Sequence, residues 1–284
     1  VPLNTGYTPA EVDYFVGDAQ PKLVICDPKS QEGLQSICEN HGAQLETLDA
    51  FGGGSFAERS VKLPETFPTV ERSIDDLAAF LYTSGTTGRS KGAMLTQGNL
   101  LSNAEALVQT WRFTSSDVLF HALPIFHTHG LFVASNVTFL AGSSMIFLSS
   151  FKAQQAIEHL PRATTMMGVP TFYTRLLDDA RLNRDLVQHM RLFISGSAPL
   201  LAETHVAFVE RTGHRILERY GMTETNMITS NPYDGERRAG TVGYPLPRVE
   251  IRITNQETAM PNTAGEIGMI EVKGPNVFTG YWNM

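Results

Sequence analysis

The sequence predicts an α/β protein whose layered sheets are flanked by helices. Short apolar runs rich in Val, Ile, Leu and Phe recur along the chain, and stretches with helical spacing lie between them. This alternation is typical of largely parallel sheets that are covered by helices on both faces. From residue 240 onward, shorter alternating runs separated by Pro, Asn and Gly indicate a small β-rich unit. We therefore expect an α/β core over residues 1–239 and a β-rich subdomain over residues 240–284.

The individual elements follow from the same patterns, taken in chain order. Apolar side chains at helical spacing predict a core-facing helix over residues 96–111, with Thr96 as its N-cap. Residues 52–69 are rich in Gly, Ser and Pro and have no clear period, so we expect a surface connection there. Five apolar runs are predicted to form strands, at residues 22–27, 77–84, 117–124, 144–149 and 191–197. Alternation predicts two strands of the β-rich unit, at residues 249–254 and 266–274.

Composition and charge exclude several classes of protein. The 284 residues carry a formal net charge of −7, from 22 Lys and Arg against 29 Asp and Glu, which leaves no basic surface for nucleic acid. The most apolar stretch, residues 131–148, is interrupted by Ser, Asn, Thr and Gly, so it predicts a helix, a turn and a strand rather than a membrane span. Cys26 and Cys38 lie in a predicted strand and helix, where we expect reduced thiols and hence a cytoplasmic location.

Both ends of the sequence resemble internal positions of a longer chain. The first residues lack the charged start and apolar middle of a signal peptide, and there is no initiator Met. The last residues stop directly after a strand-like run, without a linker or a closing helix. We therefore expect the natural protein to continue beyond both ends.

A segment rich in Gly and hydroxyl residues lies between two predicted strands. Its sequence TSGTTGRSKG comprises Thr83, Ser84, Gly85, Thr86, Thr87, Gly88, Arg89, Ser90, Lys91 and Gly92. Glycines let backbone N–H groups turn toward a phosphate, hydroxyls add donors, and Lys91 supplies a positive charge. The spacing differs from a Walker A loop, because Gly88 is followed by Arg-Ser-Lys-Gly. The segment predicts a polyphosphate-binding loop, and the alternative is a flexible Ser/Thr/Gly turn.

Three histidines, His121, His127 and His129, lie close together and raise the possibility of a metal site. No Cys accompanies them, and no fourth ligand is evident in the sequence, so a zinc site is disfavoured. We expect structural roles for His121 and His129.

Five segments in the same order resemble the adenylate-forming, or AMP-binding, superfamily of acyl-CoA synthetases, luciferases and peptide-synthetase adenylation domains. The phosphate-loop segment TSGTTGRSKG is the first, and the others are residues 123–130, 195–200, 217–225 and 265–282. Within the superfamily, the chain is most similar to malonyl-CoA synthetases and matches their large N-terminal domain. The resemblance covers most of the chain, and five ordered matches are far more specific than one.

The resemblance implies that ATP, Mg²⁺ and coenzyme A take part in the reaction. A carboxylate would attack the α-phosphorus of ATP to give an acyl-adenylate and pyrophosphate, and the thiol of coenzyme A would then displace AMP. By resemblance, Thr223 contacts the α-phosphate, Glu224 holds Mg²⁺, Lys91 supports the phosphates, and His127 lies beside the carboxylate pocket and the thiol channel. The adenine pocket would be formed by Gly196, Ser197, Ala198, Pro199, Glu218, Arg219 and Tyr220, with the phosphates contacted from Thr83 to Gly88.

The acid is predicted from a helix that begins near Pro170 and carries Arg175. The resemblance implies that this arginine pairs with the far carboxylate of malonate, a small-molecule dicarboxylate, and that Thr128 and Met227 bound its C2 substituent. In the alternative interpretation, Arg175 only pairs with nearby acidic residues on the helix surface. Malonate is therefore the leading hypothesis, with methylmalonate as a second substrate. The alternatives are a ligase for acetate or another short monocarboxylate, and a non-catalytic nucleotide-binding fragment.

The family pattern extends beyond this sequence. It continues with a Thr-Gly-Asp segment that binds ribose, a hinge, and a small lid domain bearing a catalytic Lys. None of these parts is present in residues 1–284. Because the family uses the mobile domain to complete both half-reactions, we expect weak or no turnover from these residues alone.

Overall fold

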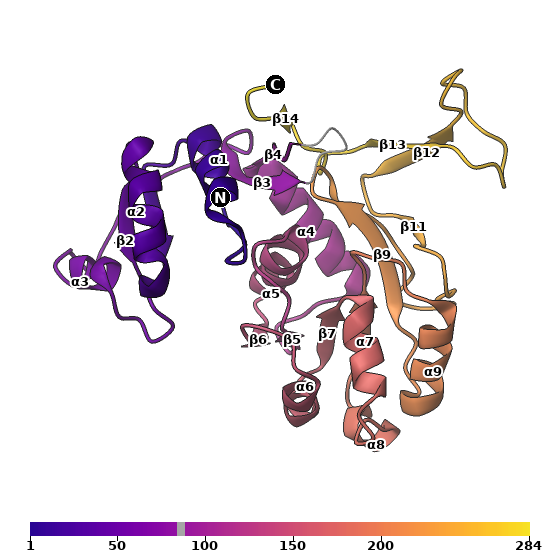
Figure 1. Cartoon of the computed structure of the whole chain (residues 1–284). Coiled ribbons are helices and arrows are strands. Elements are labelled where there is room, and N and C mark those ends of the chain that lie inside the picture. Colours follow the sequence, from indigo (N-terminus) through magenta and orange to yellow (C-terminus); the bar gives the residue numbers. More distant parts are fainter. Residues whose placement is uncertain (84–88) are drawn as a thin grey trace. The chain divides into compact units, whose positions relative to one another are not determined.

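The computed structural model describes residues 1–83 and 89–284. Its contacts divide the chain into two compact units, Val1–Arg72 and Ser73–Met284 (Figure 1). The expected boundary near residue 240 lies inside the second unit, and the division there into core and β-rich subdomain stays a prediction. Among the described residues, every helix is too short or too polar to cross a membrane.

The first unit is a small α/β arrangement. Its strands β1 (Leu23–Cys26) and β2 (Gln44–Thr47) pair in parallel, and η1 (Pro28–Ser30) and α2 (Gln31–Asn40) connect them. Helix α1 (Pro9–Ala19) begins with a capping box, in which Thr8 accepts from the backbone of Glu11 and Glu11 accepts from that of Thr8. Val16, Ile37 and Cys38 are buried in its core. Both cysteines of the unit are free thiols, as the sequence predicts.

The surface connection expected over residues 52–69 has no buried residue, and it contains one short helix. Helix α3 (Ser55–Ser60) lies within it. The Ser55 hydroxyl and Arg59 both donate to the Glu46 carboxylate, and the Ser55 backbone N–H donates to Thr47 Oγ1 at 3.1 Å. These contacts with β2 stabilise a helix too short to show an apolar period in the sequence.

The second unit is built on a seven-stranded sheet with the order β11-β10-β9-β8-β7-β5-β6. Its parallel strands are β5 (Val118–His121), β6 (Ser144–Phe147), β7 (Thr165–Gly168), β8 (Leu192–Ser195) and β9 (Leu217–Met222). Strands β10 (Asn226–Ser230) and β11 (Tyr244–Pro245) continue it in antiparallel pairing. The sheet is therefore largely parallel, and the predicted strands at 117–124, 144–149 and 191–197 are confirmed.

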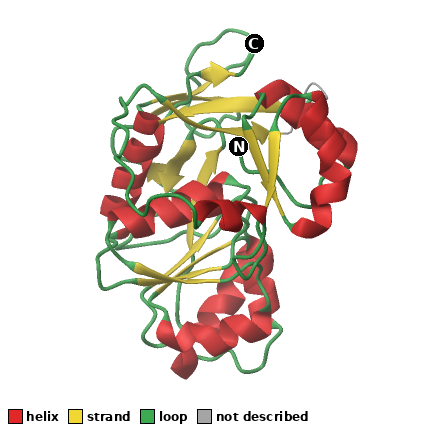
Figure 2. Ribbon diagram, turned by 90° about the vertical axis from the view of Figure 1, so that its left-hand side faces the viewer, coloured by secondary structure: helices red, strands yellow, loops and turns green. Residues whose placement is uncertain are grey.

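Helices cover both faces of this sheet (Figures 1 and 2). On one face, α4 (Gln97–Trp111) packs against η2 (His129–Ala134) and α5 (Ser135–Leu140). On the other, α7 (Pro170–Leu177) packs against α6 (Ala153–His159) and α9 (Ala202–Thr212), and the short η3 (Leu160–Arg162) and α8 (Arg184–Val187) lie beside them. Helix α4 begins at the predicted N-cap, since Thr96 Oγ1 accepts from the Asn99 N–H at 3.1 Å.

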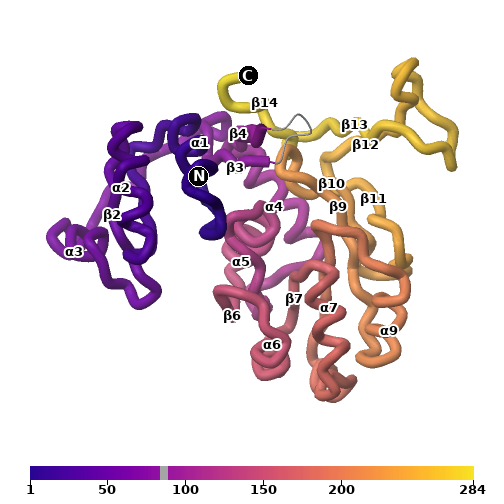
Figure 3. The backbone as a smooth tube through the Cα atoms, viewed as in Figure 1, coloured from indigo at the N-terminus to yellow at the C-terminus, as the bar shows by residue number. Residues whose placement is uncertain are grey.

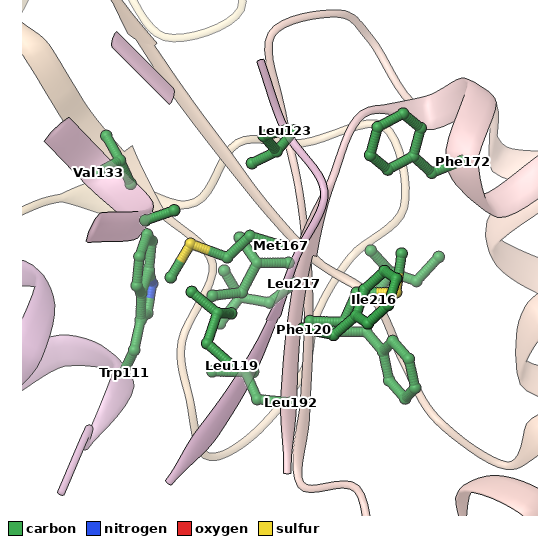
Figure 4. Close-up of a cluster of buried hydrophobic side chains, with 14 of the residues drawn as sticks. Trp111, Leu119, Phe120, Leu123, Val133, Met167, Phe172, Leu192, Ile216 and Leu217 are labelled. Carbon is green, nitrogen blue, oxygen red and sulfur yellow. The ribbon is translucent and has the colours of Figure 1, made fainter. Parts of the chain in front are cut away.

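The hydrophobic core of this unit occupies the space between the sheet and both helix layers (Figure 4). All four residues of β7 and of β8 are buried, because a central parallel strand is covered on both faces. Trp111 lies on one side of the strands and Phe172 on the other, and both are buried. Two-sided burial explains why β8 lies within a continuous apolar run in the sequence.

A buried ion pair closes the end of the sheet at which β5 begins. Arg191 donates from Nε and Nη2 to the two carboxylate oxygens of Asp117, at 2.7 Å each, and Thr164 donates to Asp117 at 2.8 Å. Burial alone would raise the pKa of Asp117, but the hydrogen bonds and the charge of Arg191 hold this pKa below its ordinary value. Asp117 is therefore ionised although it is only 4% exposed, and Arg191 compensates its buried charge.

The remaining strands form two smaller antiparallel sheets. β3 (Leu77–Thr83), β4 (Lys91–Thr96) and β14 (Gly280–Tyr281) form one, and Figure 3 shows the yellow tube of β14 beside β4. β12 (Glu250–Thr254) and β13 (Met269–Lys273) form the other, at the two predicted positions. The pairing of β3 with β4 is antiparallel, because the connection between them is too short for a parallel crossover, which needs roughly a dozen residues.

Candidate active site

The predicted phosphate loop connects two antiparallel strands. Thr83 ends β3 and is paired across the sheet with Lys91, the first residue of β4. Both ends of the loop are thereby fixed by a strand. The intervening predicted residues, Ser84, Gly85, Thr86, Thr87 and Gly88, lie outside the described residues.

Lys91 and Glu224 both lie next to the side chain of Tyr281. Glu224 lies with Thr223 in the tight turn between β9 and β10, and its side chain is buried. The Tyr281 hydroxyl donates to Glu224 Oε1 at 2.8 Å, and Lys91 Nζ lies 5.2 Å from the centre of the same ring. Burial and the adjacent carboxylate raise the pKa of Tyr281 to about 12, so the hydroxyl keeps its proton at neutral pH. The structure thus brings together the two groups predicted to hold the phosphates and Mg²⁺.

The donor set around Glu224 suits a Mg²⁺ ion that arrives with a nucleotide. Oε1 accepts from Tyr281, and among the described residues no donor contacts Oε2. The described part of the chain holds no group of three His, Cys, Asp or Glu side chains that could bind a metal alone. Mg²⁺ commonly takes one or two carboxylates, with water and substrate phosphates as its other ligands. One carboxylate with a free oxygen fits that pattern.

The turn predicted to contact adenine follows β8 at the carboxyl end of the parallel strands. Gly196 is buried, whereas Ser197, Ala198 and Pro199 are exposed. Ser197 has φ 69°, a left-handed conformation that costs roughly 1–3 kcal/mol outside glycine and is common at functional sites. Ligands of open α/β sheets bind at this edge. The turn therefore lies where a nucleotide is expected.

The three other predicted adenine residues divide between the two faces of β9. Glu218 accepts from the Gly240 N–H at 3.2 Å, and burial raises the pKa of its carboxyl. Tyr220 points to the same face as Glu218, because alternate residues of a strand share a face. The Tyr220 ring is partly exposed there. Arg219, between them, points to the opposite face.

The face of β9 that carries Arg219 is the one covered by α4. Arg219 is paired with Ser230 of β10, and the Ser230 hydroxyl accepts from Trp111 Nε1 at 3.0 Å. Trp111 is the last residue of α4, which packs against η2. Arg219 therefore faces the histidine-containing segment that precedes α5, on the side of β9 opposite Glu218 and Tyr220.

The Arg219 guanidinium is buried, and among the described residues no carboxylate forms an ion pair with it. The residue is 3% exposed, and a Cβ added to Gly196 would lie 2.3 Å from Arg219 Cζ. Within residues 1–83 and 89–284, nothing accepts a hydrogen bond from its Nε or Nη2. Burial lowers the pKa of Arg219 to about 9, so the guanidinium remains charged at neutral pH. A buried cation without a partner is costly, and it marks a position where an anion would be stabilised.

His129 supplies a second buried polar group on this side. Its Nδ1 lies 3.2 Å from Ser197 Oγ, and among the described residues its Nε2 has no partner. Burial lowers the pKa of His129 far below its ordinary value, and the charge of Arg219 lowers it further. The imidazole is therefore neutral at pH 7, and either ring nitrogen can carry the proton.

The other two histidines differ in exposure. His121 Nε2 donates to the Gly130 carbonyl at 2.9 Å, which confirms a structural role. His127 is exposed, next to the half-buried Thr128. In the described ranges, the three histidines do not form a metal-binding group, and the hydrogen bond of His121 leaves only its Nδ1 free.

Thr128 and Met227, the predicted neighbours of the C2 substituent, are connected through Asn226. The Thr128 hydroxyl donates to Asn226 Oδ1 at 2.6 Å, and Met227 is the next residue along β10. Asn226 is 1% exposed and has φ 49°, and no described residue accepts from its Nδ2. A buried amide donor without an acceptor adds to the capacity of this region to bind an anion.

Arg175 lies exposed on α7. It forms no hydrogen bond or ion pair with any described residue, Asp178 and Asp179 included. Asp179 instead accepts from Arg181 Nε at 2.9 Å and from Arg181 Nη2 at 2.7 Å. The structure therefore provides two candidate cations for a carboxylate, the exposed Arg175 and the buried Arg219.

Sequence reasoning assigned no role to Tyr281 and Asn226. Tyr281 lies inside one segment that carried the family resemblance, residues 265–282, and Asn226 directly follows another, residues 217–225. Tyr281 is distant from Glu224 in the chain, so only the pairing of β14 with β4 reveals their contact. The sequence therefore identified the segment that contains Tyr281, but it did not show that Tyr281 contacts Glu224.

The arrangement combines two kinds of binding group at one edge of the sheet. Lys91 and Glu224 can hold the phosphates and cation of a nucleotide. Arg219, His129 and Asn226 offer buried donors that lack acceptors among the described residues. Such a site can bring an anionic substrate to a nucleotide phosphate, because each negative charge has its own stabilising groups.

Comparison with known proteins agrees with this geometry. A family model described as "AMP-binding enzyme" matches residues 1–282. A malonate–CoA ligase of Arabidopsis thaliana is 34% identical over 306 residues, covering 100% of this chain and 50% of the relative. The ATP-bound crystal structure of MatB from Rhodopseudomonas palustris is 60% identical with a TM-score of 0.97, covering 100% of this chain and 56% of that one. A malonyl-CoA ligase complex with methylmalonyl-CoA and AMP is 36% identical with a TM-score of 0.84, covering 99% and 58%. The chain spans about half the length of the curated relatives it matches.

Proposed function

The chain belongs to the AMP-binding enzyme family, and on this premise we propose that the protein containing it is an ATP-dependent acid–CoA ligase for malonate. Methylmalonate is a second substrate in this proposal. The products are malonyl-CoA, AMP and pyrophosphate. The malonate–CoA ligase of Arabidopsis thaliana and the complex with methylmalonyl-CoA and AMP support this choice of acid.

The observation that carries the dicarboxylate proposal is the buried guanidinium of Arg219, whose Nε and Nη2 have no acceptor among the described residues. A short dicarboxylate places one carboxylate at the reacting phosphorus and leaves the second charge inside the protein. That second charge needs a buried cation with several donors, which a guanidinium provides. Acetate and other monocarboxylates have no such requirement. Arg175, the cation chosen from the sequence, is exposed and would meet a more solvated part of the substrate.

The reaction follows from the two sets of groups. A malonate oxygen attacks the α-phosphorus of ATP, the bond to the β-phosphate bridging oxygen breaks, and pyrophosphate leaves. Lys91 and Thr223 stabilise phosphate charge, and Mg²⁺, held by Glu224 and the phosphates, would neutralise more of it. The coenzyme A thiol then attacks the acyl carbon, and AMP leaves. His127, exposed beside Thr128, is the residue proposed to face the incoming thiol.

Arg219→Leu tests the dicarboxylate proposal in the protein at its full length. Because the second carboxylate would lose its buried partner, kcat/KM for malonate-dependent pyrophosphate release should fall about 100-fold, whereas the rate with acetate should stay within about threefold. Arg175→Leu is the matched variant, since it removes the same group from an exposed position. Rates with malonate, methylmalonate and acetate are compared for all three proteins.

The pattern of losses separates the possibilities. A selective loss of malonate use in Arg219→Leu assigns the second carboxylate to Arg219, and the same loss in Arg175→Leu assigns it to the helix. Equal losses with malonate and acetate would contradict a dicarboxylate-binding role for the affected arginine. If the unmodified protein prefers acetate, the enzyme is a ligase for a short monocarboxylate.

A further inference from the structure

Tyr281 connects the two sides of the proposed nucleotide site. It lies on β14, where it is paired with Ala93 of β4, two residues after Lys91. Its hydroxyl donates to Glu224 Oε1 at 2.8 Å, and its ring lies under Lys91 Nζ. One side chain therefore contacts both the predicted metal-binding carboxylate and the predicted phosphate-binding amine.

The backbone around Tyr281 is held on both sides. The Phe278 N–H donates to the Glu224 carbonyl at 2.7 Å, and the Trp282 N–H donates to the Gly92 carbonyl at 2.8 Å. Asn276 Nδ2 donates to the Thr225 carbonyl at 2.7 Å. The segment thus ties the start of β4 to the turn that carries Glu224, and Tyr281 lies between these anchors.

The contact with Tyr281 restricts the Glu224 carboxylate. A free glutamate side chain samples several rotamers, and fixing it costs conformational entropy each time it binds a ligand. The Tyr281 hydroxyl occupies one carboxylate oxygen, whereas the described residues leave the other without a donor. The carboxylate is therefore oriented before a cation arrives, with one oxygen available to it.

We propose that Tyr281 is a positioning residue, which fixes the Glu224 carboxylate so that its free oxygen ligates the cation of a bound nucleotide. The proposal rests on the proposed function, since it takes Glu224 as a Mg²⁺ ligand. The proposed role belongs to the Tyr281 hydroxyl and not to its ring. The aromatic ring has a separate contact with Lys91 and with Phe278, whose ring centre lies 4.9 Å away.

Tyr281→Phe in the full-length protein removes the hydroxyl and keeps the ring. ATP affinity is measured by calorimetry with Mg²⁺ and again with EDTA. The affinity for ATP with Mg²⁺ should fall about tenfold, because the charged Glu224 carboxylate loses the hydrogen bond that orients it. The affinity for ATP with EDTA should stay within about twofold. The kcat of pyrophosphate release should fall by a similar factor while KM for the acid stays unchanged. Tyr244→Phe is the matched control, because Tyr244 is a 73% exposed tyrosine of β11.

A double-mutant cycle with Glu224→Gln distinguishes positioning from general damage. In the Glu224→Gln background, Tyr281→Phe should cause no further loss of Mg²⁺-dependent affinity, since the two residues act through one contact. Equal losses with Mg²⁺ and EDTA, or additive losses in the cycle, would overturn the proposal. Tighter Mg-ATP binding by Tyr281→Phe would also overturn it, because the hydroxyl would then compete with the cation. Absence of acid-dependent pyrophosphate release from the unmodified protein would refute the ligase function, whereas the binding comparison tests Tyr281 independently.

Discussion

Glu224→Gln should lower the rate of malonate-dependent pyrophosphate release about 10²–10³-fold, the range found when one preorganised charge-stabilising group is removed. Glutamine keeps the size of the side chain and can still accept from the Tyr281 hydroxyl, but it has lost the negative charge that a hard divalent cation prefers. The loss should appear in kcat, because the charge acts when pyrophosphate departs. Steady-state kinetics at saturating ATP and malonate measure it.

A matched control comes from Glu218, a buried glutamate on the neighbouring strand that accepts from the Gly240 N–H. Glu218→Gln keeps an acceptor for that hydrogen bond, so it should affect ATP binding more than kcat. If Glu224→Gln retains more than about a third of the original kcat, Glu224 does not hold the catalytic cation.

Asp117→Ala should destabilise the second unit by about 3–5 kcal/mol, because truncation leaves the Arg191 guanidinium partly buried without its counterion. For a unit of this size, the midpoint of thermal unfolding should drop by roughly 10–15 °C. The matched control is Asp234→Ala, which removes an aspartate from the pair with Arg112 at the surface, where both side chains are at least 60% exposed. An exposed pair contributes about 0–1 kcal/mol, so this control should unfold near the unmodified protein.

The same ion pair predicts a pH dependence of stability. The pKa of Asp117 is lower in the folded protein than the value of about 3.9 for an unfolded aspartate. The folded state thus favours the ionised carboxylate, and its contribution is fully present above that value and is lost as pH falls through the folded pKa. The difference in unfolding free energy between the unmodified protein and Asp117→Asn should shrink below about pH 4. A difference that stays constant from pH 7 to pH 3 would rule out this linkage.

Local patterns were sufficient to predict most of the fold. The runs that became β5 and β8 are continuous and apolar because helices cover both faces of the sheet there. Thr96 was recognisable as an N-cap because the capping residue and the apolar period of α4 are adjacent in sequence. Helix α3 was missed because its contacts with Glu46 and Thr47 are tertiary. The sequence did not specify the direction in which β3 pairs with β4, because the composition of these strands suits parallel and antiparallel sheets alike.

Motifs in the sequence identified most residues of the candidate site, but they do not show the direction in which each side chain points. Glu218, Arg219 and Tyr220 are consecutive in one motif and were predicted to share one pocket. Strand geometry separates the middle residue from its neighbours, and the pairing of Arg219 with Ser230 shows which face it occupies. The contact of Tyr281 with Glu224 depends on strand pairing over a long chain separation, which one sequence cannot reveal.

The opposite orientation of neighbouring side chains on β9 has an evolutionary consequence. Substitutions at positions 217, 219 and 221 alter the side toward α4, whereas those at 218 and 220 alter the other side. Replacement of residues on the side toward α4 would therefore change the acid that a family member accepts, while the residues on the other side continue to bind the nucleotide. A single-residue insertion within this strand would exchange the two sets and abolish both abilities at once.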